Sequence, residues 1–330
     1  MKKLLSTFAA TALIAFAAPS SALNILLVND DGFSLNAQAQ YDALTAAGHD
    51  VLVSIPCTNQ SGKGASINFL TPLTPLTAAC RNNAAPVGAP GVGPIEGKPN
   101  FFYVNGTPVM ATAYGLDILA PQRWGKAPDL VLSGPNEGQN TGPIVNSSGT
   151  VSNAQYATSL GLSAIAVSAD ANTTNDPALA AEAAQLILKL VDRLKSNAHG
   201  GRLLPQGVAL NVNYPKFTAG QSTAFDWALS RHGTYTPIFL KFVPDLSQDP
   251  IAQAAGVNTP YPGIVFNPNT APPTKQQRND EAVVIAAGKV SVTVMQAGFD
   301  ADDQTRRRIS HELRGLFGEC GIKSRRKDCD

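Results

Sequence analysis

Short apolar runs alternate with longer amphipathic or mixed stretches over residues 24–214 of this chain. Apolar runs of about four to eight residues are typical of buried strands, whereas apolar positions that repeat every three or four residues are typical of helices. We expect Asn36 to cap the first helix, Gly48 to end it, and Pro177 to begin the longest helix. The pattern predicts strands at residues 25–28, 51–55, 129–132, 164–167 and 208–212, and helices at residues 37–47, 150–160 and 177–194.

Such alternation is typical of a mostly parallel sheet with helices on both faces. We therefore expect an α/β fold, a Rossmann-like three-layer sandwich. Residues 71–100 are rich in Pro, Gly and Ala without periodicity, and they predict a long surface loop. After Tyr214 the pattern breaks. Residues 237–243 and 261–266 then predict a hairpin excursion, residues 290–295 a last strand, and residues 304–317 a terminal helix.

The first 22 residues have the form of a secretory signal peptide. Met1-Lys2-Lys3 is a basic start, residues 4–17 are an apolar run too short to span a bilayer, and Ser20-Ser21-Ala22 is a small-residue cleavage site. We expect an exported protein, periplasmic or secreted. The rest shows no clean linker, so residues 23–330 are expected to form a single domain with a core at 24–215 and an excursion with C-terminal elements at 216–330.

Charge and cysteine content narrow the class further. The formal net charge is +1, which favours neither a nucleic-acid duplex nor a membrane surface as a partner. The four cysteines, Cys57, Cys80, Cys320 and Cys329, form no CxxC motif, so zinc bound by thiolates is not expected. In an exported protein they are candidates for disulfides, and proximity favours Cys57–Cys80 and Cys320–Cys329 among three possible connectivities.

Two adjacent carboxylates end the first predicted strand, in Asn29-Asp30-Asp31-Gly32. Carboxylates packed side by side repel each other, and Mg²⁺ or Mn²⁺ prefers such oxygen ligands. Open α/β sheets also place their ligands at the carboxyl ends of strands. The alternative is an ordinary tight turn, which the same residues favour.

Three further segments rich in small polar residues follow strand-like runs. In a parallel sheet they would emerge at the same edge as the two carboxylates, where they would offer oxygen ligands to a cation. Ser148-Gly149-Thr150, at the start of a predicted helix, also suits a phosphate. These segments are Asn59-Gln60-Ser61-Gly62-Lys63-Gly64, Ser133-Gly134-Pro135-Asn136-Glu137-Gly138-Gln139-Asn140 and Asn146-Ser147-Ser148-Gly149-Thr150.

At these residues the chain resembles the SurE-type nucleotidases, a family of survival-protein phosphatases that includes exported acid phosphatases. The matches run in the family's order over roughly residues 24–215, and residues 290–293 resemble a later strand. The matching motifs are Asn29-Asp30-Asp31-Gly32, Ser61-Gly62, Gly106-Thr107-Pro108, Ser133-Gly134-Pro135-Asn136-Glu137-Gly138-Gln139-Asn140, Ser148-Gly149-Thr150-Val151 and Leu210-Asn211-Val212-Asn213.

The resemblance implies a metal-dependent phosphomonoesterase, a 5′-nucleotidase (EC 3.1.3.5) or acid phosphatase. It would hydrolyse nucleoside 5′- and 3′-monophosphates and other small phosphate esters by metal-assisted attack of water. It further implies one Mg²⁺ or Mn²⁺ ion per subunit and a homodimer or homotetramer assembled through the excursion. The alternative is an exported, non-catalytic metal- or nucleotide-binding protein of the same fold. The implied catalytic residues are Asp30 and Asp31, the metal ligands are Asp30, Asp31, Ser61 and Asn136, and the phosphate-binding residues are Asn140, Ser148, Gly149 and Thr150.

The chain departs from the family pattern at Met110, where the family usually has Asp, and this bears on substrate preference more than on metal binding. Residues 33–36 also lack the common Ala-Pro-Gly. Arg231-His232-Gly233 resembles the signature of histidine phosphatases, but Tyr235 replaces the signature's second arginine, so a polar loop is the favoured interpretation. Glu137 is expected to be a solvated loop acid, with contact to the outer-shell water of a cation as the alternative.

Overall fold

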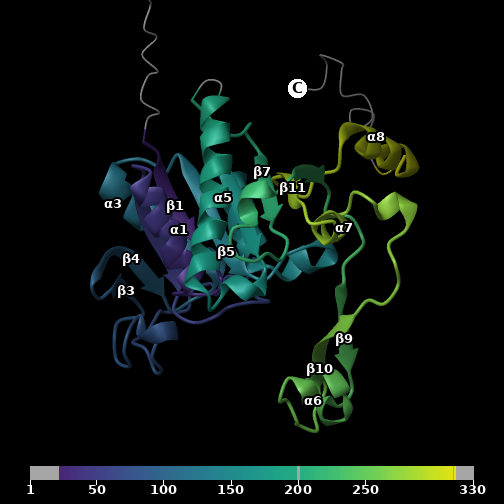
Figure 1. The fold of residues 1–330 in the computed structure, drawn as a ribbon, viewed down its shortest axis with the longest axis horizontal. Coiled ribbons are helices and arrows are strands. Elements are labelled where there is room, and N and C mark those ends of the chain that lie inside the picture. The colour runs from purple at the N-terminus through teal and green to yellow at the C-terminus, as the bar shows by residue number, and fades with distance from the viewer. Residues whose placement is uncertain (1–21, 199–200, 315, 317–330) are drawn as a thin grey trace, which may run out of the picture.

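The computed structural model describes residues 22–198, 201–314 and 316, and its centre is a nine-stranded sheet (Figure 1). The strand order is β3-β4-β2-β1-β5-β6-β7-β11-β8, and the strands from β4 to β7 are mutually parallel. The strands of this sheet are β1 (Asn24–Val28), β2 (Asp50–Pro56), β3 (Val92–Ile95), β4 (Lys98–Val104), β5 (Leu130–Glu137), β6 (Ala164–Ala169), β7 (Val208–Asn213), β8 (Trp227–Ser230) and β11 (Val290–Gln296).

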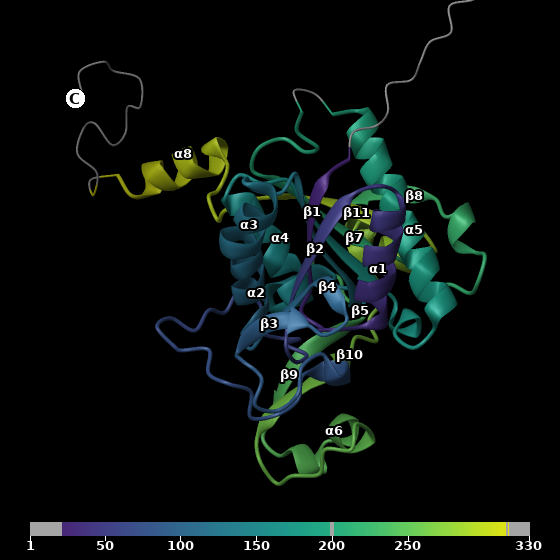
Figure 2. The ribbon, with the colours of Figure 1, turned by 90° about the vertical axis from the view of Figure 1, so that its left-hand side faces the viewer.

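Helices cover both faces of the sheet and make three layers. Helices α1 and α5 lie together on one face, and α2, α3 and α4 lie on the other (Figure 2). The helices are α1 (Leu35–Ala46), α2 (Pro108–Tyr114), α3 (Ala120–Trp124), α4 (Gly149–Ser159), α5 (Pro177–Ser196), α6 (Pro250–Ala254), α7 (Glu281–Ala286) and α8 (Asp303–Glu312). None of the helices within the described residues is both long and apolar enough to span a bilayer.

Strand β1 shows how the sequence builds these layers. Successive side chains of a strand point to opposite faces. Ile25 and Leu27 accordingly pack in the core beneath α1 and α5, while Leu26 and Val28 pack in the core beneath α4. All four are almost fully buried, which explains why the run is continuously apolar rather than alternating. The α/β three-layer fold expected from the sequence is confirmed.

A two-stranded antiparallel ribbon, β9 (Ile238–Val243) with β10 (Gly263–Pro268), projects from the sheet-bearing body and carries α6 at its tip (Figure 1). This confirms the hairpin excursion predicted after Tyr214. The last strand, β11, is also confirmed, and it runs antiparallel to β7.

Several local predictions were wrong. Helix α1 is capped by Ser34, whose hydroxyl accepts from the Ala37 N–H, because Asn36 is buried and its amide donates to Thr173. The stretch 71–100, predicted to be a long loop, contains β3 and the start of β4. The Gly and Pro residues of these strands interrupt the apolar pattern by which a strand is predicted. The terminal helix α8 ends at Glu312 rather than at residue 317. The sequence pattern also missed α2, α3, α6, α7 and β8.

The Cys57–Cys80 disulfide is present, as expected. The Cys320–Cys329 pairing and the signal-peptide interpretation fall on residues 317–330 and 1–21, outside the described part of the chain.

Candidate active site at the carboxyl ends of β1 and β5

The turn after β1 aims two carboxylates into the protein. The Asn29 side chain closes this turn, since its Nδ2 donates to the Gly32 carbonyl at 2.8 Å and its Oδ1 accepts from the Gly32 N–H at 3.1 Å. Gly32 has a φ of +81°, and a Cβ there would lie 2.9 Å from the Pro56 carbonyl oxygen, so only glycine fits. Asp30 and Asp31 are 3% and 1% exposed. The tight-turn interpretation is therefore confirmed, and the role of the two carboxylates as ligands stays a prediction.

Asp30 faces the first turn of α4. Its Oδ1 accepts a 2.5 Å hydrogen bond from the Thr150 hydroxyl, and the nearby backbone N–H groups of Gly149 and Thr150 also act to lower the pKa of this carboxyl. A Cβ on Gly149 would come within 2.6 Å of the Asp30 Cβ, which explains why the helix begins with glycine. Burial raises the pKa of Asp30, and the Thr150 hydrogen bond opposes that rise.

Asp31 lies between two other elements. Its Oδ2 accepts from the Glu137 N–H at 3.2 Å and its Oδ1 from the Asn59 Nδ2 at 3.4 Å. Burial holds the pKa of Asp31 well above its usual range, and repulsion by Asp30 and Glu137 adds to the effect. Two buried acids that resist ionisation are typical of a functional centre.

The donor set around these carboxylates suits a hard divalent cation. Asn136 in β5 directs its Nδ2 to the Gly138 carbonyl at 2.8 Å, while its Oδ1 is buried without a hydrogen-bond partner. A buried amide oxygen without a partner is costly unless a ligand satisfies it. Within the described residues no group of three or more His, Cys, Asp or Glu could hold a metal, so a cation here would need neutral oxygens beside Asp30 and Asp31. The residues present fit Mg²⁺ or Mn²⁺.

Ser61 is less well placed than the other expected ligands. Its loop is tied to the site, because the Gln60 N–H donates to the Asp30 carbonyl at 2.8 Å. The Ser61 side chain itself is exposed, and its backbone N–H donates to the Asn59 Oδ1 at 2.9 Å. The structure brings the Ser61 loop to the expected edge without joining its hydroxyl to either carboxylate.

Three of the four expected phosphate-binding residues, Ser148, Gly149 and Thr150, lie at the start of α4, which faces Asp30. The Ser148 hydroxyl caps α4 by accepting from the Val151 N–H at 3.1 Å, and the Thr150 hydroxyl is engaged by Asp30. Asn140 is buried and its Nδ2 donates to the Ser168 hydroxyl at 2.9 Å. Their role in binding phosphate stays a prediction.

Sequence reasoning missed three residues that support this centre. Asn153 on α4 donates to the Asn29 carbonyl and to Ser133, which ties the ends of β1 and β5 to the helix. Fully buried Glu281 accepts from the Asn211 amide at 2.7 Å, and Asn211 in turn holds the Asn140 carbonyl. The third, Arg81, is 50 residues from Asp31 and donates to its carbonyl at 2.8 Å.

The expectation for Glu137 was wrong. Strand β5 extends through Ser133 to Glu137, so this acid ends a strand rather than standing in a loop. Its side chain is 12% exposed and forms an ion pair with Arg81 at 2.9 Å. The polar-loop interpretation of Arg231-His232-Gly233 agrees with the contacts, since Arg231 pairs with Asp280.

Met110, the departure from the family pattern, lies in the first turn of α2. Its backbone N–H points to the Thr107 hydroxyl, which caps the helix, at 3.4 Å. Its half-buried side chain packs against Gly106, where a Cβ would be 3.1 Å from the Met110 Cε. The side chain thus fills space beside the loop that precedes α2.

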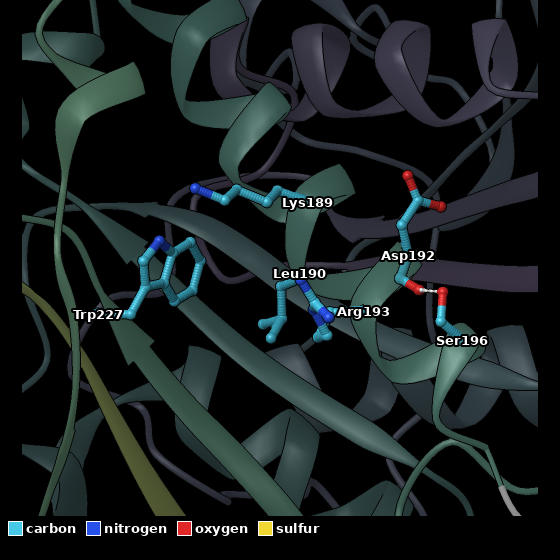
Figure 3. Close-up of a pocket in the computed structure, with 6 residues that line it drawn as sticks. All are labelled: Lys189, Leu190, Asp192, Arg193, Ser196 and Trp227. Atoms are coloured by element: carbon cyan, nitrogen blue, oxygen red, sulfur yellow. Dashed lines mark hydrogen bonds between the residues drawn. The ribbon is translucent and has the colours of Figure 1, made fainter.

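A cavity of about 650 Å³ lies elsewhere, and Figure 3 shows the six side chains that line it. Five come from α5 and one, Trp227, from β8, whereas the acid pair and its partners come from β1, β5 and α4. The Ser196 hydroxyl that borders it donates to the main-chain carbonyl of Asp192 at 2.7 Å. Nothing in this lining offers a nucleophile or a pair of acids, so the carboxyl edge of the sheet remains the candidate active site.

Known proteins resemble the part of the chain that carries this candidate site. The family model "Survival protein SurE" matches residues 25–236. The chain is 36% identical over 208 residues to an acid phosphatase of Yarrowia lipolytica and 35% identical over 199 residues to a 5′-nucleotidase SurE of Desulfovibrio desulfuricans. These matches cover 59% and 58% of this chain, and they span 58% and 66% of those two proteins, which is less than two thirds of each.

A solved structure resembles the whole fold. The crystal structure of a SurE protein from Aquifex aeolicus superimposes with a TM-score of 0.63 at 25% sequence identity. The match covers 88% of this chain and 99% of that one. It therefore extends beyond residues 25–236, the part matched by the family model.

Proposed function

The chain belongs to the survival protein SurE family, and from that premise we propose that it is a divalent-cation-dependent phosphomonoesterase that hydrolyses nucleoside monophosphates and other small phosphate esters. The observation that carries the proposal is the buried pair Asp30 and Asp31 together with the buried, partnerless Oδ1 of Asn136, whose neighbour Glu137 donates its N–H to Asp31. Relatives named acid phosphatase and 5′-nucleotidase support the reaction class. We assign the 5′-monophosphates as preferred substrates.

In this proposal Asp30, Asp31 and Asn136 would hold Mg²⁺ or Mn²⁺, and Ser61 would be a further ligand. The chemistry that such a cation supplies is polarisation of the phosphoryl oxygens and activation of water. Thr150 orients Asp30 through the 2.5 Å hydrogen bond, and the Glu137 N–H orients Asp31. The start of α4 and the Asn140 amide would stabilise charge on the phosphoryl oxygens as it develops.

We assign the nucleoside to a cavity of about 440 Å³ that the sequence neighbours of Asn140 line. Gln139 and Thr141, the neighbours of Asn140, line it together with Tyr235 and Lys216. An aromatic ring contributes about 1–3 kcal/mol when a base stacks on it. Tyr235→Ala should therefore raise KM for a nucleotide about tenfold and leave KM for p-nitrophenyl phosphate unchanged. Trp227→Ala, which removes an aromatic ring from the other cavity, is the matched control.

The excursion supports assembly into a homodimer or homotetramer. Phe242, Ile264 and Phe266 on the β9–β10 ribbon are 69%, 61% and 59% exposed, an apolar surface that a second copy would cover. Light scattering should give a multiple of the chain mass, and Phe242→Ser with Phe266→Ser should reduce it to one chain. We also propose export through residues 1–22, and N-terminal sequencing of the exported protein should begin at Leu23.

Phosphate release tests the activity. EDTA-treated protein is assayed on nucleoside 5′- and 3′-monophosphates and p-nitrophenyl phosphate, before and after addition of Mg²⁺ or Mn²⁺. Metal-restored hydrolysis that is fastest with 5′-monophosphates is expected, while equal rates on all esters would favour a broad phosphatase. Folded protein that binds nucleotide without hydrolysis under either metal would refute catalysis and favour the non-catalytic binding protein.

A further inference from the structure

The Cys57–Cys80 disulfide fixes Arg81 beside the acid pair. Cys57 directly follows β2, and both cysteines are 3% exposed. The Arg81 N–H donates to the Cys57 carbonyl at 2.8 Å, and the Cys57 N–H donates to the Val104 carbonyl in β4 at 2.7 Å. The backbone of Arg81 is thus anchored at the end of β2, which pairs with β1 in the sheet.

The Arg81 guanidinium joins the carboxyl ends of β1 and β5. Its Nη1 donates to the main-chain carbonyl of Asp31 at 2.8 Å, and its Nη2 lies 2.9 Å from both carboxylate oxygens of Glu137. The Arg81 and Glu137 side chains are 24% and 12% exposed. Water therefore screens this ion pair less than it screens a surface pair.

Glu137 adjoins the groups assigned to the cation. Its N–H donates to the Asp31 Oδ2, and Asn136 is the preceding residue. A carboxylate is a strong ligand for a hard cation, and it can occupy two coordination positions. An unpaired Glu137 would compete with phosphoryl oxygens for those positions. In the structure Arg81 engages both of its oxygens.

We propose that Arg81 is a positioning residue that holds the Glu137 carboxylate away from the bound cation, and that the Cys57–Cys80 disulfide keeps Arg81 in place. This inference rests on the proposed function. Loss of Arg81 would place a third free carboxylate beside Asp30 and Asp31, so cation binding would tighten while turnover fell. An ion pair that only stabilised the loop would not move these two quantities in opposite directions.

The test combines Mn²⁺ binding, measured by electron paramagnetic resonance of the free ion, with kcat on a nucleoside 5′-monophosphate. Arg81→Ala should bind Mn²⁺ about tenfold more tightly, because a nearby positive charge is lost and a carboxylate is released, and its kcat should fall at least tenfold. Adding Glu137→Gln should return both quantities toward wild type. Arg123→Ala is the control, since Arg123 makes a similar pair with Asp50 at the opposite end of β2 and should change neither.

The outcomes separate the two proposals. Unchanged Mn²⁺ affinity in Arg81→Ala, or no recovery on adding Glu137→Gln, would overturn the inference while wild-type activity upheld the proposed function. Wild type that neither binds Mn²⁺ nor releases phosphate would overturn both. If Arg81→Ala does not fold, Arg81→Gln carries the same test, because an amide can still donate to the Asp31 carbonyl without neutralising Glu137.

The part played by the disulfide has its own test. The double variant Cys57→Ala/Cys80→Ala should reproduce the tighter Mn²⁺ binding of Arg81→Ala. Adding Arg81→Ala to it should then have a smaller effect than in wild type, because the same carboxylate is already released and only the loss of the positive charge is new. Additive effects on Mn²⁺ affinity, in variants whose circular dichroism matches wild type, would overturn the role of the disulfide.

Discussion

Replacing Asp31 with Asn should stabilise the cation-free protein and abolish turnover. Asp30 repels Asp31 and helps to raise its pKa. Two unit charges taken at a separation of about 6 Å repel by about 3 kcal/mol at an effective dielectric constant of about 20. Asn keeps the size of the side chain and one acceptor oxygen, so one of the two hydrogen bonds that Asp31 accepts is lost, at a cost of about 1 kcal/mol. The expected net gain in the free energy of unfolding is roughly 1–2 kcal/mol.

The stability difference between Asp31→Asn and wild type should grow as pH rises. The pKa of Asp31 is raised well above its ordinary value of 3.8 by burial, then by Asp30 and Glu137. The folded state therefore binds this proton more tightly than the unfolded state, and wild type loses stability as pH rises from 3.8 through the folded pKa. Asp31→Asn has no such loss, so its advantage should be full above the folded pKa of Asp31 and shrink as pH falls toward 3.8.

Urea denaturation in EDTA, followed by circular dichroism, measures this difference. Asp42→Asn, which changes an exposed acid on α1, is the matched control and should equal wild type. Added Mn²⁺ should reverse the order, because ligand at 100 times its Kd stabilises wild type by about 2.7 kcal/mol and cannot bind the variant as tightly. If Asp31→Asn is less stable than wild type in EDTA at neutral pH, the acid pair is not under repulsion and the reasoning fails.

Three further outcomes are expected. Thr150→Val should lower the free energy of unfolding at neutral pH by about 1.5–3 kcal/mol and reduce kcat, since Asp30 loses its 2.5 Å hydrogen bond. Thr150→Ser keeps the hydroxyl and should retain wild-type stability and kcat in the same denaturation and phosphate-release assays. Burial, then the charge of Lys195, lowers the pKa of His49, so the stability that depends on neutral His49 is full above pH 6.5 and falls as pH drops toward the folded pKa. His49→Asn should flatten this stability profile between pH 7.5 and 5. An unchanged slope would refute the assignment of the pH dependence to His49. Reduction of the Cys57–Cys80 disulfide, whose cysteines are 23 residues apart in sequence, should lower the free energy of unfolding by about 3 kcal/mol, as measured by urea denaturation.

The sequence predicted the centre of the fold well because its elements have strong local signals. The strand β1 is a continuous apolar run with a turn behind it, and helix α5 begins at a proline and keeps one apolar face for 20 residues. Parallel pairing then places the ends of β1, β2 and β5 at one edge, so the gathering of their loops followed from the fold class.

The failures have physical causes of their own. Strand β4 pairs with β3 on one side and with β2 on the other, and this tertiary pairing overrides a segment whose Gly and Pro residues favour a loop. Pairing with β6 carries β5 through Ser133 to Glu137, although Gly134 and Pro135 favour a break. The Cys57–Cys80 disulfide and the turn that follows it position Arg81 beside the site, and no local sequence pattern indicates such a long-range contact.

Phosphate release from a nucleoside 5′-monophosphate by EDTA-treated protein, before and after addition of Mn²⁺, tests most directly whether Asp30 and Asp31 form a cation-dependent phosphatase centre. Hydrolysis that Mn²⁺ restores in wild type and not in Asp31→Asn is the predicted result. Hydrolysis that persists in EDTA, or that Asp31→Asn retains in full, would contradict the assignment.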